Sequence, residues 1–390
     1  MQENTRDSLI LLGSTGSIGV QTLDVAARLD IPVDALCAHR DVDGVEAQAR
    51  RFGVRAVAMG DEQAARELKL KLADTETRVY AGEMGILDMI RESPAEIALN
   101  AIIGEAGLLP TLAVLESDKQ LALANKESLV VAGEIVMARA REKGIHIRPV
   151  DSEHCAVSQC LMAGQGREVN KIILTASGGP FFGKTRAELK DMRARDALAH
   201  PTWSMGQKIT IDSATMMNKG FEVIEASYLF DVPQSSIDVV VHRESIIHSM
   251  VEYIDYSVMA QMAVPDMRHC IQHALTHPAR EAGAIKPLNL ADIGTLTFAR
   301  PDEETFSLLR MARETMAAGG AAPAVLNAAN EVAVAAFLRD EISFCTIFDV
   351  VEQTVRDLSS ASDAHTLEDI LEYDRQARRL CTKYLTHGGV

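Results

Sequence analysis

The amino-acid sequence predicts an α/β fold with an N-terminal Rossmann-like dinucleotide-binding domain, a central α/β domain and a C-terminal helical bundle. Three observations lead to this prediction. A glycine-rich turn at residues 13–19 lies between a short apolar run and a helical pattern. Apolar runs then alternate with helical segments to about residue 150, which is typical of a parallel, doubly wound sheet. After residue 310 the apolar residues follow helical periodicity alone.

The predicted strands and helices divide the chain into three parts and a connector. Residues 1–150 form the nucleotide-binding domain, with strands at 8–12, 33–38, 56–58, 97–103, 120–124 and 145–150. In residues 151–289, the central domain, glycine and polar clusters separate strand-like runs at 171–175, 238–241 and 257–262. Residues 290–310 are irregular and form the connector. Residues 311–390 complete a bundle whose helical patterns cover 303–318, 323–339, 346–358 and 366–385.

Two of the C-terminal helices carry a helix-start signal. Thr346 with Asp349, and Thr366 with Asp369, have the spacing at which each side chain satisfies a backbone N–H of the first turn. The sequence therefore predicts that helices begin at both threonines.

Length, composition and charge exclude several classes of protein. A chain of 390 residues with 47% hydrophobic and 24% charged residues is typical of two or three globular units, not of a disordered or low-complexity protein. The formal charge of −16 disfavours a nucleic-acid partner or an anionic membrane surface. No run of eighteen apolar residues predicts a transmembrane helix, and the N-terminal segment lacks the basic leader of a signal peptide. The six scattered cysteines indicate reduced thiols, so a cytoplasmic location is expected.

The glycine turn predicts a nucleotide site. The spacing Gly13-x-x-Gly16-x-x-Gly19 is a variant of the dinucleotide fingerprint, in which a pyrophosphate lies on the helix N-terminus. The alternative is a structural glycine-rich turn. At the end of the second predicted strand, Arg40 favours the 2′-phosphate of NADP, whereas Asp41 could either repel that phosphate or cap the turn.

Carboxylates predict a cation site at the end of the first domain. In an extended chain Asp151 and Glu153 share one face, and paired carboxylates suit Mg²⁺ or Mn²⁺. Glu222 is a candidate third ligand. The alternative for the pair is a turn with a capping aspartate.

A dense group of polar residues at 211–222 predicts an anion site. Ser213, Asn218 and Lys219 supply neutral donors and one ammonium, which together suit a phosphate. The alternative is an amphipathic helix with a polar face. The triplet Asn125-Lys126-Glu127 is a similar polar group after a predicted strand.

Glycine clusters at 177–180 and 203–206 bracket a segment that could close as a lid. The only tryptophan of the chain, Trp203, lies at its end and suits a lid that excludes water. The alternative is an ordinary loop with one buried aromatic ring. A zinc site is not expected at His269, His273 and His277, and His154 is interpreted, with its neighbouring cysteines, as a core residue beside a functional turn.

Seven strings, taken together, resemble one enzyme family. They are LGSTGSIG (12–19), LANKESL (123–129), PVDSEH (149–154), SGGPF (177–181), HPTWSMG (200–206), DSATMMNKG (212–220) and LNAANE (326–331). In this order, and over nearly the whole chain, they resemble the 1-deoxy-D-xylulose 5-phosphate reductoisomerases. The resemblance implies NADPH- and Mg²⁺- or Mn²⁺-dependent isomerisation and reduction of 1-deoxy-D-xylulose 5-phosphate to 2-C-methyl-D-erythritol 4-phosphate, by a homodimer with a lid loop in its central, catalytic domain.

The resemblance also implies roles for individual residues. Metal ligands are Asp151, Glu153 and Glu222. Substrate contacts are Lys126, Ser152, Glu153, Ser177, His200, Ser213, Asn218, Lys219 and Glu222, with Trp203 as the lid aromatic; Lys126, His200, Trp203 and the three carboxylates form the expected catalytic set. Cofactor contacts are Thr15, Gly16, Ser17, Ile18, Arg40, Asn125, Glu127 and Gly206. His39 and Asp41 depart from the family pattern, whereas Arg40 keeps its basic position. NADPH is therefore still expected, and only the size of its advantage over NADH is left open.

Two alternatives remain beside this assignment. An NADP-dependent dehydrogenase of another phosphorylated sugar would share the glycine turn but has no use for three converging carboxylates. A non-catalytic NADP-sensing protein would bind NADPH without metal-dependent turnover, and nothing would require the group Ser213, Asn218 and Lys219.

Overall fold

A computed structural model describes residues 6–199, 201–203 and 205–387. The chain forms two compact units, each discontinuous in sequence. The first unit comprises the chain up to Asn125, then Val136–Cys155 and Asp266–Lys286; the second comprises Lys126–Ile135, Ala156–Pro265 and the chain from Pro287 onward. These units do not follow the predicted boundaries at residues 150 and 310. One reason is that α12 (Arg268–Thr276) packs on α1 (Ser17–Arg28) and contributes Ile271 and Ala274 to the core of the first unit.

The first unit contains a parallel seven-stranded sheet in the order β4-β3-β2-β1-β5-β6-β7. The strands are β1 (Leu9–Leu12), β2 (Val33–Ala38), β3 (Ala56–Met59), β4 (Arg78–Ala81), β5 (Ile97–Asn100), β6 (Gln120–Leu123) and β7 (Arg148–Pro149). The strand order reverses between β1 and β5, and ligands of doubly wound sheets bind at the carboxyl ends of the strands at such a switch point. The sequence missed β4 because this edge strand is polar and only partly buried.

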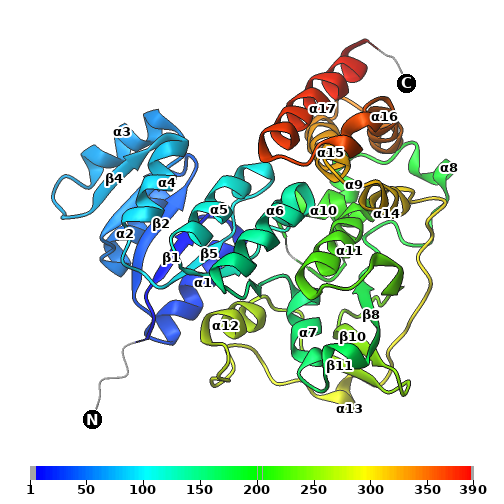
Figure 1. The fold of residues 1–390 in the computed structure, drawn as a ribbon, viewed down its shortest axis with the longest axis horizontal. Helices are drawn as coiled ribbons and strands as arrows, with labels where there is room; N and C mark the ends of the chain where they lie inside the picture. The colour runs from blue at the N-terminus through cyan, green and yellow to red at the C-terminus, as the bar shows by residue number, and fades with distance from the viewer. Residues whose placement is uncertain (1–5, 200, 204, 388–390) are drawn as a thin grey trace. The chain divides into compact units, whose positions relative to one another are not determined.

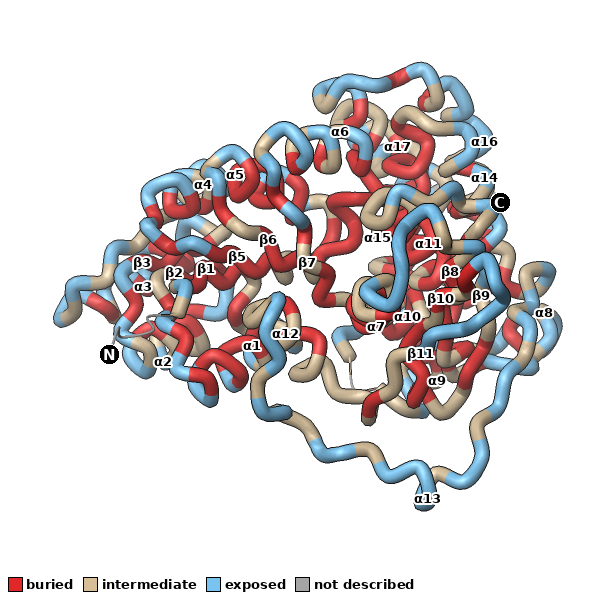
Figure 2. Tube along the Cα trace, turned by 60° about the horizontal axis from the view of Figure 1, so that its bottom comes forward, coloured by how far each residue is buried: buried red, intermediate tan, exposed pale blue. Residues whose placement is uncertain are grey.

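Apolar residues of the central strands and of the helices beside them form the core of the first unit. β1, β3 and β5 are buried along their whole length, as the tube in Figure 2 shows. The remaining helices of this unit are α2 (Val42–Phe52), α3 (Glu62–Lys71), α4 (Gly82–Glu92), α5 (Leu108–Glu116) and the later part of α6 (Glu127–Lys143), with the short 3-10 helix η1 (Glu105–Gly107). The predicted Rossmann-like architecture is therefore confirmed.

The second unit contains a mixed four-stranded sheet in the order β11-β10-β8-β9. Its strands are β8 (Val169–Ala176), β9 (Ile237–Val241), β10 (Ile247–Tyr253) and β11 (Val258–Met262). β8 and β9 are parallel, whereas β10 runs antiparallel to both β8 and β11. The sequence did not predict β10, in which His248 and Ser249 are polar yet buried.

Helices make up the rest of the second unit (Figure 1). They are α7 (Ser152–Leu161, which begins in the first unit), α8 (Arg186–Leu189), α9 (Ala194–Ala197), α10 (Gln207–Ala214), α11 (Met217–Phe230), α13 (Leu290–Ile293), α14 (Leu308–Ala318), α15 (Ala322–Leu338), α16 (Phe344–Asp357) and α17 (Leu367–His387), with the 3-10 helices η2 (Gly166–Glu168), η3 (Gln234–Ser236) and η4 (Ser359–Asp363). Over the described residues, no helix is long and apolar enough to cross a membrane.

One of the two predicted helix-start signals is wrong. α16 begins before Thr346, because the Ser343 side chain caps it by accepting the Thr346 N–H at 3.2 Å. The other signal is confirmed: the Asp369 N–H donates to the Thr366 hydroxyl, which in turn donates to the Asp369 carboxylate.

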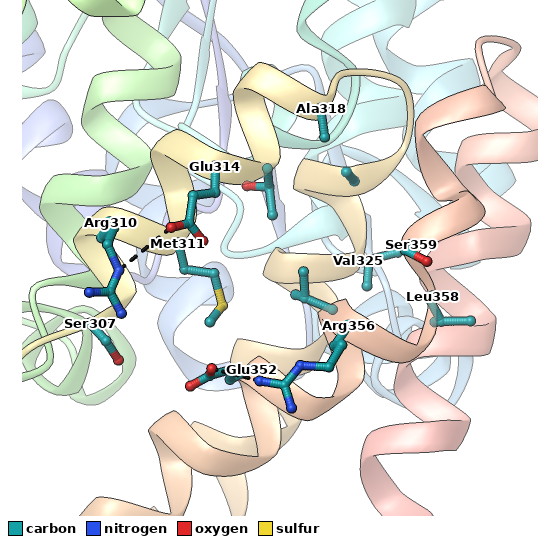
Figure 3. A pocket seen from close by; sticks show the side chains of 13 residues that line it. Ser307, Arg310, Met311, Glu314, Ala318, Val325, Glu352, Arg356, Leu358 and Ser359 are labelled. Atoms are coloured by element: carbon teal, nitrogen blue, oxygen red, sulfur yellow. Dashed lines mark hydrogen bonds and ion pairs between the residues drawn. The ribbon is translucent and has the colours of Figure 1, made fainter.

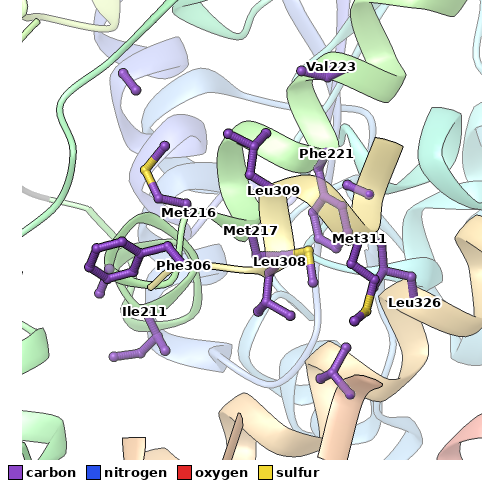
Figure 4. Close-up of a cluster of buried hydrophobic side chains, with 14 of the residues drawn as sticks. Ile211, Met216, Met217, Phe221, Val223, Phe306, Leu308, Leu309, Met311 and Leu326 are labelled. Carbon is purple, nitrogen blue, oxygen red and sulfur yellow. The ribbon is translucent and has the colours of Figure 1, made fainter. Parts of the chain in front are cut away.

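The C-terminal helices share one apolar core with the central domain. Phe221 of α11 packs among Leu308 and Leu309 of α14 and Leu326 of α15, and all four side chains are fully buried (Figure 4). The rings of Phe344 in α16 and Phe181, which follows β8, lie 4.8 Å apart. The predicted bundle therefore exists, but it forms a single compact unit with the helices that carry the central polar residues.

Candidate active site

The glycine turn after β1 is shaped by close backbone contacts. Gly13 has φ +86°, and a Cβ there would lie 2.6 Å from the Ala101 carbonyl oxygen. A Cβ on Gly19 would lie 2.2 Å from the Gly13 carbonyl oxygen. Gly16 caps α1 and supplies no side-chain acceptor for its first amides. The predicted strand, turn and helix are present, and the segment Thr15, Gly16, Ser17 and Ile18 forms a helix N-terminus suited to a phosphate.

The segment after β2 shows which role Asp41 has. Its carboxylate accepts the Gly44 N–H at 3.0 Å and is the N-cap of α2. The exposed Arg40 guanidinium donates from Nε to the Asp61 carboxylate at 3.0 Å. Of the two possibilities for Asp41, the structure supports the cap.

Asn125, after β6, orders the loop that follows β5. Its amide Nδ2 donates to the carbonyl oxygens of Ile102 at 2.7 Å and Gly104 at 2.8 Å. A Cβ on Gly107 would lie 2.5 Å from the same amide group, so the loop packs closely on Asn125.

Asp151 and Glu153 lie at the start of a helix. The predicted extended geometry is wrong because α7 begins at Ser152, which places Glu153 in the first helical turn. Asp151 Oδ1 accepts the Glu153 N–H at 3.1 Å and lies 3.0 Å from Nδ1 of His154. The Ser152 hydroxyl donates to the Glu153 carboxylate. The helix start, rather than an extended strand, therefore brings these polar groups together.

A buried group of charges surrounds Glu222, which is only 1% exposed. Lys126 Nζ donates to Glu222 Oε1 at 3.0 Å and to Asn218 Oδ1 at 2.9 Å. Lys219 Nζ donates to the other Glu222 oxygen and to the Thr175 carbonyl oxygen. Asn218, Lys219 and Glu222 come from the first turns of α11, and Lys126 directly precedes α6. Residues predicted from two distant segments are thus in direct contact.

The three predicted metal ligands, Asp151, Glu153 and Glu222, all offer carboxylate oxygens, the ligand atoms that Mg²⁺ and Mn²⁺ prefer. Asp151 and Glu153 lie in the first unit, and Glu222 lies in the second.

Two further buried potential ligands, His154 and Glu225, were not included in the predicted site. His154 Nδ1 lies 3.0 Å from Asp151 Oδ1 within the first unit. Helical spacing could have found Glu225, because it follows Glu222 by three residues on α11. No group of potential metal ligands among the described residues includes His269, His273 or His277.

Two serines of the predicted anion site lie side by side. The hydroxyl oxygens of Ser177, after β8, and Ser213, in α10, are 3.5 Å apart. Gly179 has φ +64°, and a Cβ there would lie 2.7 Å from the Ser213 carbonyl oxygen. Arg243 donates to the carbonyl oxygens of Ser177 and Gly179, which fixes this turn.

Of the predicted lid residues, Trp203 can be placed, whereas His200 lies outside the described residues. The Trp203 ring packs edge-on against the buried ring of His248 in β10, with centroids 6.0 Å apart. The sequence did not single out His248 because β10 itself was not predicted. Gly206 is the N-cap of α10.

Glu127 is ion-paired within the second unit. Its carboxylate accepts from Lys208 Nζ at 2.7 Å, and Asp212 Oδ2 lies 2.8 Å from the same nitrogen. Burial opposes ionisation of Glu127, but the Lys208 charge and hydrogen bond outweigh it and hold the Glu127 pKa below its ordinary value.

A cavity of about 460 Å³ opens among α14, α15 and α16 (Figure 3). Its two arginines are paired with glutamates of their own helices, Arg310 with Glu314 at 3.6 Å and Arg356 with Glu352 at 2.8 Å. None of the predicted site residues that the structure describes lines it, so this cavity is not part of the candidate site.

A doubly wound sheet with a glycine-rich turn in the first unit, and a buried glutamate held by two lysines in the second, are features of a class, the nucleotide- and metal-dependent oxidoreductases. Comparison with known proteins identifies the family within this class. Models described as 1-deoxy-D-xylulose 5-phosphate reductoisomerase and its C-terminal domain match residues 9–133 and 147–230, and a model described as the DXP reductoisomerase C-terminal domain matches residues 262–380. The chain belongs to the 1-deoxy-D-xylulose 5-phosphate reductoisomerase family.

Relatives and solved structures support this membership over nearly the whole chain. The 1-deoxy-D-xylulose 5-phosphate reductoisomerase of Acetivibrio thermocellus is 51% identical over 95% of this chain and 97% of its own. That of Bacteroides fragilis is 46% identical over 99% and 100%. The Zymomonas mobilis enzyme in complex with NADPH is 41% identical with a TM-score of 0.91, covering 98% and 100%. A reductoisomerase complex with NADPH, fosmidomycin and magnesium is 38% identical with a TM-score of 0.92, covering 97% and 98%.

Proposed function

We propose that the protein converts 1-deoxy-D-xylulose 5-phosphate to 2-C-methyl-D-erythritol 4-phosphate with NADPH and a divalent cation, Mg²⁺ or Mn²⁺. The observation that carries the proposal is the match of the family's models to residues 9–133, 147–230 and 262–380, in a chain that has the carboxylates Asp151, Glu153 and Glu222. A simple sugar dehydrogenase or an NADP sensor has no need of such a group.

The donor sets fit both groups that the reaction requires. Carboxylate oxygens suit the cation, and Asp151, Glu153 and Glu222 would hold it. The uncapped start of α1 suits the NADPH pyrophosphate, with Thr15, Gly16, Ser17 and Ile18 beside it. Arg40 would meet the 2′-phosphate, and Asn125, Glu127 and Gly206 complete the proposed cofactor contacts.

Charge balance favours an anionic substrate once the cation is bound. Lys126 and Lys219 carry two positive charges, and the three carboxylates carry three negative ones. A divalent cation would change the net charge of this group from −1 to +1, which favours a phosphorylated sugar. Lys219 and Asn218, with Ser177 and Ser213, would hold the phosphate by charge-assisted hydrogen bonds.

The side chains around Glu222 would orient the substrate. When bound, the cation supplies Lewis-acid polarisation of the substrate oxygens and NADPH supplies hydride. Lys126 would donate from Nζ to a substrate oxygen near Glu222, and the Ser152 hydroxyl would do the same beside Glu153. Trp203 would exclude water from the reacting atoms, and His200 is proposed as a further substrate contact.

The parts of the chain would divide this work. Residues 1–150 would bind NADPH, residues 151–289 would bind cation and substrate, and residues 311–390, after the connector 290–310, would support them. We also propose a cytoplasmic location, which the six buried cysteines support, since none of them forms a disulfide in the structure.

We further propose that the protein is a homodimer. The turn between β10 and β11 exposes Ile254 and Tyr256, and the edge strand β11 exposes Val258 and Met259. An exposed apolar edge of this kind is typical of a surface that a second chain covers. Sedimentation equilibrium of the wild-type protein and of Val258→Glu tests this proposal.

NADPH oxidation on addition of 1-deoxy-D-xylulose 5-phosphate, with Mg²⁺, Mn²⁺ or chelator, tests the activity. We expect cation-dependent oxidation and 2-C-methyl-D-erythritol 4-phosphate as the product. A simple ketone reduction product would favour the dehydrogenase. NADPH binding without turnover would favour the sensor.

A further inference from the structure

A buried charge network connects the C-terminal helices to the candidate site. It consists of Glu127 at the start of α6, Lys208 and Asp212 in α10, Asn330 and Glu331 in α15, and Arg378 in α17. All six residues belong to the second unit. Asn330 and Glu331 end the LNAANE string, to which the proposed function gives no role.

Hydrogen bonds and ion pairs join α6, α10 and α15, and a further ion pair joins α15 to α17. Lys208 Nζ donates to Glu127 Oε1 at 2.7 Å and to Asp212 Oδ2 at 2.8 Å. The other Asp212 oxygen accepts from Asn330 Nδ2 at 2.8 Å. The neighbouring Glu331 carboxylate accepts from Arg378 at 2.8 Å and stabilises the charge of Lys208.

This arrangement is costly unless every partner is in place. Asn330 is fully buried, and Asp212 and Glu127 are 2% and 7% exposed. Burial dominates at Asp212 and raises the pKa of its carboxyl despite the Lys208 charge. Lys208 lies in the first turn of α10, where the helix dipole disfavours a cation. Removing one partner of such a pair leaves the other charge buried and uncompensated.

The network residues are direct neighbours of residues that the proposed function uses. Glu127 follows Lys126, whose ammonium contacts Asn218 and Glu222. Asp212 precedes Ser213, whose hydroxyl is 3.5 Å from that of Ser177. A rotation of α10 or of the α6 start would displace these side chains.

The apolar core holds the same helices together without the network. Ile211 of α10 and Leu326 and Ala329 of α15 are fully buried in the shared core. Replacing a network residue by an apolar one should therefore leave the fold intact while releasing the orientation of α10.

From these contacts we infer that Lys208 and Asn330 are positioning residues, through which the C-terminal helices α15 and α17 fix Ser213 and Lys126 for the phosphorylated substrate. The inference rests on the proposed function. The C-terminal region is then part of the machinery for substrate recognition, although none of its residues in the network is proposed to touch the substrate.

Asn330→Leu and Lys208→Met test the inference in the full-length protein with Mg²⁺ and NADPH. We expect KM for 1-deoxy-D-xylulose 5-phosphate to rise about tenfold or more, as for the loss of one hydrogen bond to a charged group, with kcat also reduced. Tm should stay within a few degrees of wild type in Asn330→Leu and fall further in Lys208→Met, which leaves two buried carboxylates without their cation. The rise in Tm that inorganic phosphate gives the wild-type protein should be smaller in both variants, which reports phosphate binding without turnover.

Thr354→Val is the matched control. Thr354 in α16 is as buried as Asn330, and its hydroxyl donates to the Val350 carbonyl oxygen and contacts the Cys381 thiol, neither of which belongs to the charge network. This variant should keep the wild-type KM, kcat and response to phosphate.

An exchange variant separates positioning from folding. Asp212→Asn combined with Asn330→Asp keeps an amide and a carboxylate across the same 2.8 Å contact. The double variant should have a lower KM for 1-deoxy-D-xylulose 5-phosphate than either single variant, Asp212→Asn or Asn330→Asp. Wild-type kinetics and phosphate response in Asn330→Leu would overturn the inference, as would losses that follow Tm alone and are not recovered by the exchange. Absence of turnover in the wild-type protein would instead refute the proposed function.

Discussion

The glycine turn and the group around Glu222 are the two proposed anion sites, and they are built from different chemical groups. The turn offers backbone amides at the start of α1, and its side chains are small and neutral. Beneath it, burial raises the pKa of the Cys37 thiol to about 12, so this side chain also stays neutral. The group around Glu222 instead buries two lysines against a carboxylate, with Lys126 and Glu222 only 5% and 1% exposed.

This difference determines how each region responds to change. A turn made of backbone tolerates no added atoms, because Cβ positions at Gly13 and Gly19 are occupied by carbonyl groups. A site made of buried ions tolerates no change of charge, since removing one partner leaves the other uncompensated. Steric substitutions should therefore damage the turn, and isosteric charge changes should damage the group around Glu222.

The largest effect is expected from Glu222→Gln, which keeps the shape and removes the charge. Both lysines lose their shared anion, and the cation loses a ligand. Steady-state kinetics should show kcat reduced by about a thousandfold, the order expected when metal polarisation is lost. Glu314→Gln, at an exposed pair with Arg310, is the control and should behave as wild type. Near-normal turnover in Glu222→Gln would contradict the claim that the group around Glu222 tolerates no change of charge.

Gly19→Ala tests the turn by adding one methyl group and no charge. The new Cβ would lie 2.2 Å from the Gly13 carbonyl oxygen, so the turn must shift. We expect a loss of about 3 kcal/mol in the free energy of unfolding, measured by denaturant titration, and weaker NADPH binding. Gly166→Ala, where a Cβ meets no atom within 4 Å, serves as the control. A Gly19→Ala protein with unchanged stability would show that the turn can accommodate a Cβ at position 19.

Arg40→Ala tests whether the Arg40 side chain makes the proposed nucleotide site at the glycine turn selective for NADPH over NADH. Arg40 is exposed and paired only weakly, through Asp61, so Tm should change little. The ratio of kcat/KM for NADPH over NADH should fall by about tenfold, the value of one charge-assisted contact. An unchanged ratio would mean that Arg40 does not select the cofactor.

The smallest effect concerns pH and comes from outside both regions. Burial, followed by repulsion from Arg280 and His277, lowers the pKa of His273 in α12 from 6.5 to about 4. The unfolded chain then binds more protons than the folded chain between these values, so stability falls as pH falls through them. Since His273 is partly exposed, the loss should not exceed about 1 kcal/mol. The fall in Tm between about pH 7 and about pH 5 should be smaller in His273→Asn, and equal slopes would contradict this assignment.

The two regions also differ in how far the sequence predicts them. The glycine turn follows from local sterics, so its strand, turn and helix were predicted with nearly the observed bounds. The contact of Lys126 with Asn218 and Glu222 joins residues about a hundred positions apart, which no local pattern encodes. Only the family resemblance placed them in one site. The same holds for His248 and for the Lys208 contacts, which the sequence prediction did not include.

Local geometry was mispredicted where a side chain replaces a backbone partner. Asp151 accepts the Glu153 N–H and so starts α7 where an extended chain was expected. β5 ends at Asn100, short of the predicted residue 103, because the Asn100 amide bonds to the Gly107 carbonyl oxygen and the Thr111 hydroxyl. In both cases a polar side chain at the end of a strand redirects the backbone.

Calorimetric titration of Mg²⁺ into the protein, without substrate or nucleotide, tests the central claim most directly. That claim is that Asp151, Glu153 and Glu222 hold one divalent cation. We predict a single saturable site in the wild-type protein and in Glu314→Gln, with binding at least about tenfold weaker in Glu222→Gln, as expected when a charged ligand is removed. Equal Mg²⁺ affinity in Glu222→Gln and the wild-type protein would contradict it.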